Sequence, residues 1–148
     1  MDFYGFYTGK IFDAYKYLGA HVEEKGVTFR TFAPSASRIT LIGEFNDWQE
    51  WEMNKVSDGN FWECYVPQAK AGQMYKYKIY DRNGNPVDHC DPYGFGMELR
   101  PSSASIIRDM SKYKFKDSQW LQSRSDCRKK PLNIYEIHFG SFRKPSDK

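Results

Sequence analysis

Four short extended segments, bounded by turn residues, constrain the fold of this chain most strongly. They span residues 27–32, 38–43, 61–66 and 75–81. Side chains of opposite character alternate along three of them, and the second is a β-branched run too short for a helix. Residues 106–109 add a candidate edge strand. Short strands at this spacing predict an all-β fold, a small antiparallel β-sandwich.

The segments that flank these strands predict a hairpin and a short helix. Asn83-Gly84 follows the last strand, and Asn-Gly between extended runs predicts a type I′ turn, in which both central residues have positive φ. Near the N-terminus, apolar residues at helical spacing predict a helix over residues 10–18, ended by Gly19. We therefore expect a helical lead-in over residues 1–25 and the sandwich over residues 26–110.

The character of the chain changes after residue 110. Residues 111–131 are rich in charged and polar side chains, which predicts a linker with a helical turn or two around Trp120. Residues 132–138 then form an apolar run typical of a strand buried on both faces, as in a parallel sheet covered by helices. Because no second such strand follows, we expect residues 132–148 to begin a larger domain.

Composition and charge exclude several classes of protein. The 148 residues carry a net charge of +3 with acids and bases intermixed, which argues against a nucleic-acid partner. No apolar run approaches the roughly 20 residues of a membrane helix, so no membrane partner is expected. Three cysteines without a CxxC spacing favour a reducing compartment. Without a signal-peptide pattern at the N-terminus, the expected localisation is cytoplasmic.

No pattern of catalytic or metal-binding residues stands out. His89-Cys90-Asp91 has no second ligand cluster at metal-binding spacing. His21 and His138 have no Ser or Cys motif beside them, so a nucleophilic triad has no support. We therefore assign no catalytic residue, no metal ligand and no cofactor.

The aromatic content is high, and one tryptophan has the surroundings of a binding residue. The 11 Tyr, 11 Phe and 4 Trp are more rings than a core of this size hides easily. Trp48 follows the second strand, beside Asn46 and Asp47, and offers a flat apolar face ringed by hydrogen-bonding groups. A pyranose, with one C–H face and a rim of hydroxyls, suits such a surface. The alternative is that Trp48 plugs the end of the sandwich against Met53.

The fourth strand sorts its side chains by parity. Tyr75, Tyr77 and Ile79 share one face, which fits the core. Lys76 and its neighbours on the opposite face can donate hydrogen bonds to hydroxyl groups. The alternative is a merely solvated face.

The sequence resembles a known family, the glycogen (1,4-α-glucan) branching enzymes, over most of its length. The similar segments, in the family's order, are LGAH at 18–21, GEFNDW at 43–48, YKY at 75–77, DPYG at 91–94, RPSSAS at 100–105 and NIYEIHFGS at 133–141. The middle part resembles a family 48 carbohydrate-binding module, an immunoglobulin-like sandwich. The last stretch resembles the first strand of the (β/α)8 catalytic barrel of the α-amylase superfamily.

The resemblance implies an activity for the parent enzyme and a role for this part of it. Such enzymes transfer an α-1,4-glucan segment to a 6-hydroxyl with retention, and their catalytic carboxylates lie on later barrel strands, so we expect these 148 residues alone to be inactive. Trp48 and Lys76 match residues that stack on or hydrogen-bond to glucan, and Asn46 stands beside them. A second stacking Trp of related modules is replaced by residues 83–86. The implied partners are α-glucan and the catalytic barrel, which the module orients.

Three alternatives stay open. One is a stand-alone glycogen-binding adaptor, which the barrel-like strand disfavours. Another is the corresponding module of a debranching enzyme or trehalohydrolase. An aromatic nucleic-acid-binding sandwich is disfavoured by the mild charge. Under the leading hypothesis several rings are expected to be exposed and to face the barrel: Phe3, Tyr4, Phe6, Tyr93, Phe95 and Trp120.

Overall fold

The computed structural model describes residues 1–127, 129–131 and 133–142. The chain divides into two compact units, Met1–Lys112 and Tyr113–Lys148. Every strand within the described residues belongs to the first unit.

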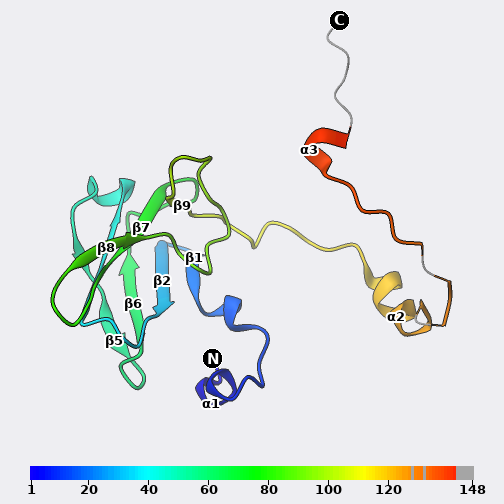
Figure 1. Ribbon diagram of the computed structural model, residues 1–148, viewed down its shortest axis with the longest axis horizontal. Coiled ribbons are helices and arrows are strands. Elements are labelled where there is room, and N and C mark those ends of the chain that lie inside the picture. The colour runs from blue at the N-terminus through cyan, green and yellow to red at the C-terminus, as the bar shows by residue number, and fades with distance from the viewer. Residues whose placement is uncertain (128, 132, 143–148) are drawn as a thin grey trace, which may run out of the picture. The chain divides into compact units, whose positions relative to one another are not determined.

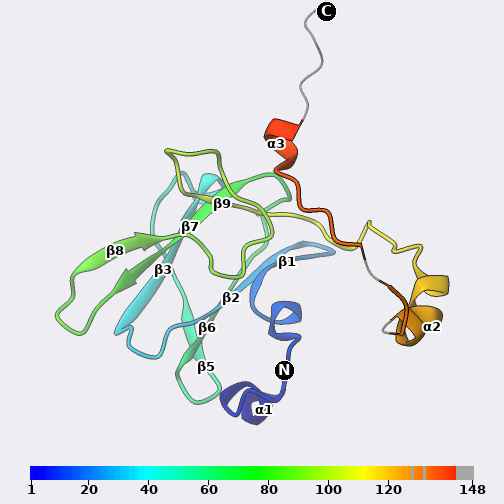
Figure 2. The ribbon, with the colours of Figure 1, turned by 45° about the vertical axis from the view of Figure 1, so that its right-hand side comes forward.

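Two antiparallel sheets make up the first unit (Figures 1 and 2). One has the strand order β1-β2-β6-β5, and the other has β4-β3-β7-β8, with β9 also paired to β7. The strands are β1 (Gly19–Glu23), β2 (Gly26–Phe32), β3 (Arg38–Gly43), β4 (Trp51–Glu52), β5 (Asn54–Val56), β6 (Phe61–Val66), β7 (Met74–Tyr80), β8 (Pro86–His89) and β9 (Ser105–Ile106). The predicted antiparallel sandwich is confirmed, and β1, β4 and β5 are strands that the sequence patterns did not predict.

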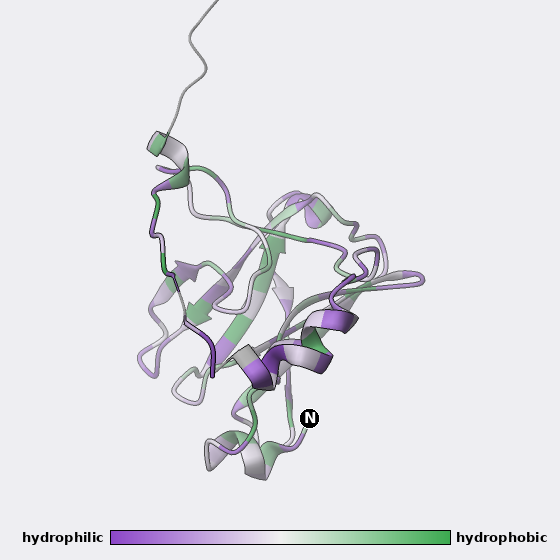
Figure 3. Ribbon diagram, turned by 90° about the vertical axis from the view of Figure 1, so that its right-hand side faces the viewer, coloured by the Kyte–Doolittle hydropathy of each residue, from purple (hydrophilic) through white to green (hydrophobic). Residues whose placement is uncertain are grey.

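The core lies between the inner faces of the two sheets. Phe29, Leu41, Tyr75 and Tyr77 are fully buried there, as strand parity predicts. Hydrophobic colour accordingly runs along the strands of the sandwich in Figure 3. Trp62 is also a core residue, and its indole N–H donates to the carbonyl oxygen of Ala33 at 3.2 Å, so its polar atom has a partner in the core.

The N-terminal segment differs from its prediction. The helix expected over residues 10–18 is wrong: α1 spans Phe3–Tyr7, and residues Ala14–Lys16 form only a 3-10 turn. The Asp2 carboxylate caps α1 by accepting from the backbone N–H of Gly5 at 2.9 Å. The Phe3 ring packs edge-on against Phe61 with centroids 4.8 Å apart. Tertiary contacts therefore decide the helix position, and Phe3, expected to be exposed, is partly buried in a second core cluster together with Phe6.

The β7–β8 hairpin also differs from its prediction. The connection is a five-residue loop, 81–85, in which Gly84 has positive φ (83°) and Asn83 does not, so the type I′ turn is wrong. The Asp81 carboxylate holds this loop by accepting from the backbone N–H groups of Asn83 and Asn85 at 2.8 and 2.9 Å. An Asx-type arrangement thus replaces the tight turn.

The second unit contains short helices. Helix α2 (Ser118–Cys127) confirms the helical turns predicted around Trp120, and α3 spans Phe139–Phe142. The strand predicted over residues 132–138 is absent from residues 133–138, and Leu132 lies outside the described residues. A strand needs a hydrogen-bonded partner strand, and the described part of this unit contains none that residues 133–138 could pair with. Among the described helices, none has the length and apolar character needed to cross a bilayer.

Candidate functional site

The structure brings two of the predicted binding residues to one corner of the β4-β3-β7-β8 sheet. Lys76 on β7 lies directly opposite Ile42 on β3. The next residue of β3, Gly43, accepts a hydrogen bond through its carbonyl oxygen from the backbone N–H of Trp48 at 2.9 Å. The backbones of Trp48 and Lys76 therefore lie near the same corner of the sheet, close to the end of β3 and the start of β7.

The GEFNDW segment is anchored on both sides of the corner. Phe45 points into the main core, where it is 8% exposed and its ring centroid lies 5.4 Å from that of Phe29. The Glu44 carboxylate accepts from the backbone N–H of Met74 at 2.8 Å. A Cβ on Gly43 would lie 2.7 Å from the carbonyl oxygen of Met74, so only glycine allows the loop to leave β3 this closely.

Asn46 is occupied inside this loop. Its side-chain oxygen accepts from the backbone N–H of Gly43 at 2.9 Å. Its side-chain NH₂ donates to the carbonyl oxygens of Leu41 and Gln49 at 3.2 and 2.6 Å. The amide predicted as a glucan-binding group is therefore engaged with backbone on three sides.

Trp48 stands out from the core. It is 41% exposed and is not a member of the core cluster, to which Met53 (4% exposed) belongs, which disfavours the alternative of a buried plug against Met53. Asp47 and Trp48 both adopt left-handed backbone conformations, with φ of 51° and 58°. Non-glycine residues rarely adopt this region, and it is least favourable for bulky side chains. The backbone therefore turns sharply where the indole ring is presented.

The two lysines on the outer face of β7 have different surroundings. Lys78 donates to the Glu50 carboxylate at 3.0 Å, and Tyr80 donates its hydroxyl to the same carboxylate at 2.8 Å. The hydrogen bonds from Tyr80 and Lys78 hold the pKa of Glu50 below its usual value, and the bond to Glu50 raises the pKa of Lys78. The Lys76 amino group has no hydrogen bond or ion pair with any described residue.

Sequence reasoning missed Glu50 as the centre of this outer-face network. Its carboxylate also accepts from the hydroxyl of Thr40 at 3.2 Å and pairs with Arg38 at 3.2 Å. The one available signal was an acidic residue close to Trp48 and opposite in charge to the lysines of β7. The network occupies Lys78 and Tyr80, so among the described outward-facing side chains of β7 Lys76 is the one whose donors stay free.

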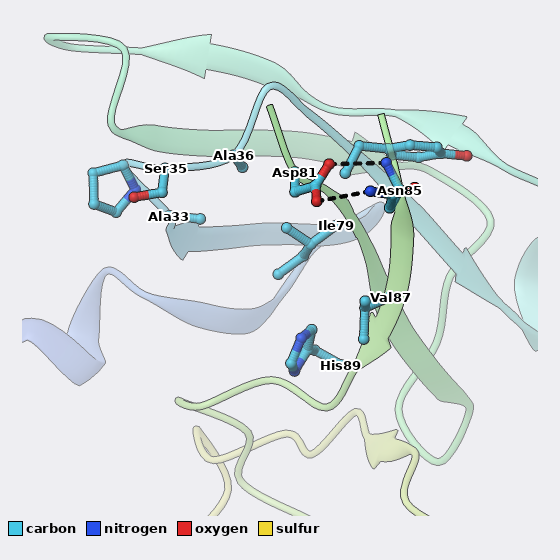
Figure 4. Close-up of a pocket in the computed structure, with 10 residues that line it drawn as sticks. Ala33, Ser35, Ala36, Ile79, Asp81, Asn85, Val87 and His89 are labelled. Carbon is cyan, nitrogen blue, oxygen red and sulfur yellow. Dashed lines mark hydrogen bonds between the residues drawn. The ribbon is translucent and has the colours of Figure 1, made fainter. Parts of the chain in front are cut away.

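A pocket on the other side of the same sheet is a second candidate (Figure 4). Its apolar floor includes Ile79 and Val87, with His89 at one end. Figure 4 shows Asp81 and Asn85 at the other end, bonded to one another through the Asn85 side chain at 3.1 Å and its backbone N–H at 2.9 Å. These polar groups hold the hairpin loop, so they are poorly placed to orient a ligand.

The His89-Cys90-Asp91 segment does not gather its side chains. His89 is exposed, whereas Asp91 is 3% exposed and accepts hydrogen bonds from the hydroxyls of Tyr75 and Tyr77 at 2.7 and 3.0 Å. Burial raises the pKa of the Asp91 carboxyl. Among the residues that the structure describes, no three His, Cys, Asp or Glu side chains are grouped to hold a metal ion.

Comparison with known proteins identifies relatives of the whole chain. It is 39% identical over 99% of its length to the 1,4-alpha-glucan branching enzyme GlgB of Fusobacterium nucleatum, of which it covers 24%. It is 37% identical, again over 99% of its length, to GlgB of Geobacillus stearothermophilus, of which it covers 24%. The chain thus spans about a quarter of the length of these curated relatives.

Solved structures share the fold at lower identity. A pullulanase from Anoxybacillus sp. LM18-11, complexed with maltotetraose, matches 71% of this chain and 15% of its own chain, with a TM-score of 0.58 and 22% identity. The maltotriose complex of the PulA-G680L mutant from Klebsiella pneumoniae matches 74% of this chain and 13% of its own, with a TM-score of 0.57 and 24% identity. The family model of carbohydrate-binding module 48 (isoamylase N-terminal domain) matches residues 17–94. The chain therefore belongs to the carbohydrate-binding module 48 family and is homologous to the N-terminal region of 1,4-α-glucan branching enzymes.

Proposed function

We propose that this module binds α-glucan chains through Trp48 and Lys76. The observation that carries the proposal is the pairing of a 41% exposed indole, on a firmly anchored loop, with the neighbouring lysine that has no partner among the described residues. The apolar face of a glucose ring would stack on Trp48. Lys76 would donate a hydrogen bond to a hydroxyl at the edge of that ring.

The module would serve a 1,4-α-glucan branching enzyme. Identities of 36–39% over 97–99% of the chain support this parent over a debranching enzyme or trehalohydrolase. The pullulanases in the structural comparison are 22–24% identical and support the shared fold alone. The parent's reaction would be the retaining transfer of an α-1,4-glucan segment to a 6-hydroxyl, which forms an α-1,6 branch.

A second role of the module would be to orient the catalytic barrel. We propose that residues 132–148 begin that barrel, because NIYEIHFGS at 133–141 resembles its first strand. No catalytic carboxylate is assigned within the chain, so these 148 residues alone are expected to be inactive. Branching of amylose by the 148-residue chain would contradict this expectation. The adaptor alternative predicts glucan binding without any attached barrel, and the length of the open reading frame decides between them.

The test of glucan binding is the Trp48→Ala variant in amylopectin affinity electrophoresis. Loss of a stacked ring should weaken binding about tenfold, or ~1.4 kcal/mol. Stability should change little, because the ring is 41% exposed and lies outside the core clusters. A matched control is Trp51→Ala, which removes another exposed indole on β4 (37% exposed). No retardation of the unmodified chain, or equal retardation of both variants, would refute the proposal.

A further inference from the structure

We propose that Asn46 is a positioning residue, which holds Trp48 in its glucan-binding orientation without touching the glucan. The proposal rests on glucan binding at Trp48. Asn46 and Trp48 stand two residues apart, and the sequence analysis predicts contact with glucan for both. Under the proposal only Trp48 contacts glucan.

The first observation is that both donors and one acceptor lone pair of the Asn46 side chain are bonded to backbone groups. This side chain joins the end of β3 to the end of the loop: its oxygen accepts from the N–H of Gly43, and its NH₂ donates to the carbonyls of Leu41 and Gln49. Both N–H donors are therefore in use, and a glucan hydroxyl could accept from this amide only by replacing a backbone carbonyl. Since a backbone group without a partner is costly, direct recognition of sugar by this amide is unfavourable.

The second observation is the backbone that the amide encloses. Asp47 and Trp48 lie between Asn46 and Gln49, and both have positive φ. Two successive non-glycine residues in this region persist only when surrounding bonds hold them there. The bonds of Asn46 to Gly43 and Gln49 fix the two ends of this turn, together with the Trp48 N–H bond to the Gly43 carbonyl at 2.9 Å.

Residues of the GEFNDW segment therefore have different roles. Phe45 anchors the loop to the core, Asn46 fixes its curvature, and Trp48 presents the ring. A loop that is already curved loses little conformational freedom when glucan binds, which strengthens binding without adding a contact. Asparagine suits the position because it supplies one acceptor and two donors in a short side chain.

A double-mutant cycle tests this role. Dissociation constants for amylopectin are measured by affinity electrophoresis for the unmodified chain, Asn46→Ala, Trp48→Ala and the double variant, well below each thermal midpoint. We expect Asn46→Ala to weaken binding about five- to tenfold, and the double variant to bind no more weakly than Trp48→Ala alone. Gln49→Ala, which removes an exposed amide with a single 3.4 Å bond to the Asp47 carbonyl, is the matched control and should bind normally.

The outcomes are distinct. Additive losses in the double variant would show that Asn46 contacts glucan itself, and normal binding by Asn46→Ala would show that the loop needs no such support; either result overturns the proposal. If Trp48→Ala binds normally, the proposed glucan site itself fails. Asn46→Asp, which keeps the acceptor for Gly43 and loses both donors, should bind with intermediate strength and replaces Asn46→Ala in the cycle if the latter does not fold.

Discussion

The outer faces of the two sheets use aromatic residues in opposite ways. On the β1-β2-β6-β5 sheet, Phe61 and Phe32 point outward, and the N-terminal segment packs on them with Phe3 and Phe6, so that Phe61 is 0% exposed. On the β4-β3-β7-β8 sheet, the outer face carries the polar network of Glu50. The Trp48 ring, at the corner of this sheet, stays exposed.

The difference shows what leaves an outward ring exposed. By strand parity Phe61 points outward, but the N-terminal segment packs on it, so its ring is buried and stabilises the fold. Trp48 is set apart because its loop is held by Asn46 and Phe45 without covering the indole. Three predictions test this contrast and are given in order of decreasing effect.

The largest effect is expected for Phe61→Ala on the covered face. The ring packs against Phe3, Phe6 and Phe32, with centroids 4.8–5.4 Å away, and its loss should lower the free energy of unfolding by about 3–5 kcal/mol. Urea denaturation measures this. Glucan binding by the folded fraction should remain unchanged.

The matched control for Phe61→Ala is Phe12→Ala, in the same N-terminal segment but 90% exposed, which should change stability by less than about 0.5 kcal/mol. A loss of stability for Phe61→Ala as small as that for Phe12→Ala would mean that the N-terminal segment does not cover Phe61 in solution. If Phe61→Ala does not fold, Phe61→Leu should show a smaller loss of the same kind.

An intermediate effect is expected when the two lysines of β7 are compared. Lys76→Met should weaken amylopectin binding about fivefold, or ~1 kcal/mol, through loss of one hydrogen bond to sugar, with stability unchanged. Lys78→Met should leave binding nearly unchanged, because its amino group is occupied by Glu50 at 3.0 Å. Weaker binding by Lys78→Met than by Lys76→Met would place the glucan on the Glu50 network instead.

The smallest effect is a pH dependence on the open face. The pKa of Glu50 is lowered by hydrogen bonds from Tyr80 and then Lys78, so its contribution to stability is present above its usual pKa of about 4.3 and is lost as the pH falls through the lower folded value. We expect the stability difference between the unmodified chain and Glu50→Gln to be about 1 kcal/mol or less near neutral pH and to shrink below pH ~4.

Urea titrations at several pH values measure this difference. Tyr80→Phe removes the first donor to Glu50 and should reduce the pH dependence without abolishing it. A difference that stays constant from pH ~6 to pH ~3 would contradict the assignment of Glu50 as the ionised centre of the network.

Much of the sandwich could be predicted because strand parity is a local property. Residues 27–32, 61–66 and 75–80 alternate, and their buried members form the core as expected. The prediction of a helix over residues 10–18 is wrong because the position of α1 depends on packing of Phe3 and Phe6 against β6, more than fifty residues away in sequence. The prediction of a type I′ turn is wrong because the Asp81 carboxylate, just before Asn83-Gly84, accepts from the backbone N–H groups of Asn83 and Asn85.

For the candidate site, the sequence indicates candidate residues and not the surroundings of each. Trp48 and Lys76 could be chosen from residue type and parity, and the structure places them at one corner. Asn46 could not be separated from a ligand-binding amide, because its partners are backbone groups of Leu41, Gly43 and Gln49, whose positions depend on the curvature of the loop.

The amino-acid sequence encodes the alternation of buried and exposed side chains along the strands, and with it the sandwich and the polar face of β7, since side-chain direction along a strand follows from backbone geometry alone. Tertiary contacts set which outward residues stay available. They cover Phe61 with the N-terminal segment, occupy Lys78 with Glu50, and leave Trp48 and Lys76 unoccupied by the described residues. The reason is physical: availability depends on contacts between segments distant in sequence, which no local pattern encodes.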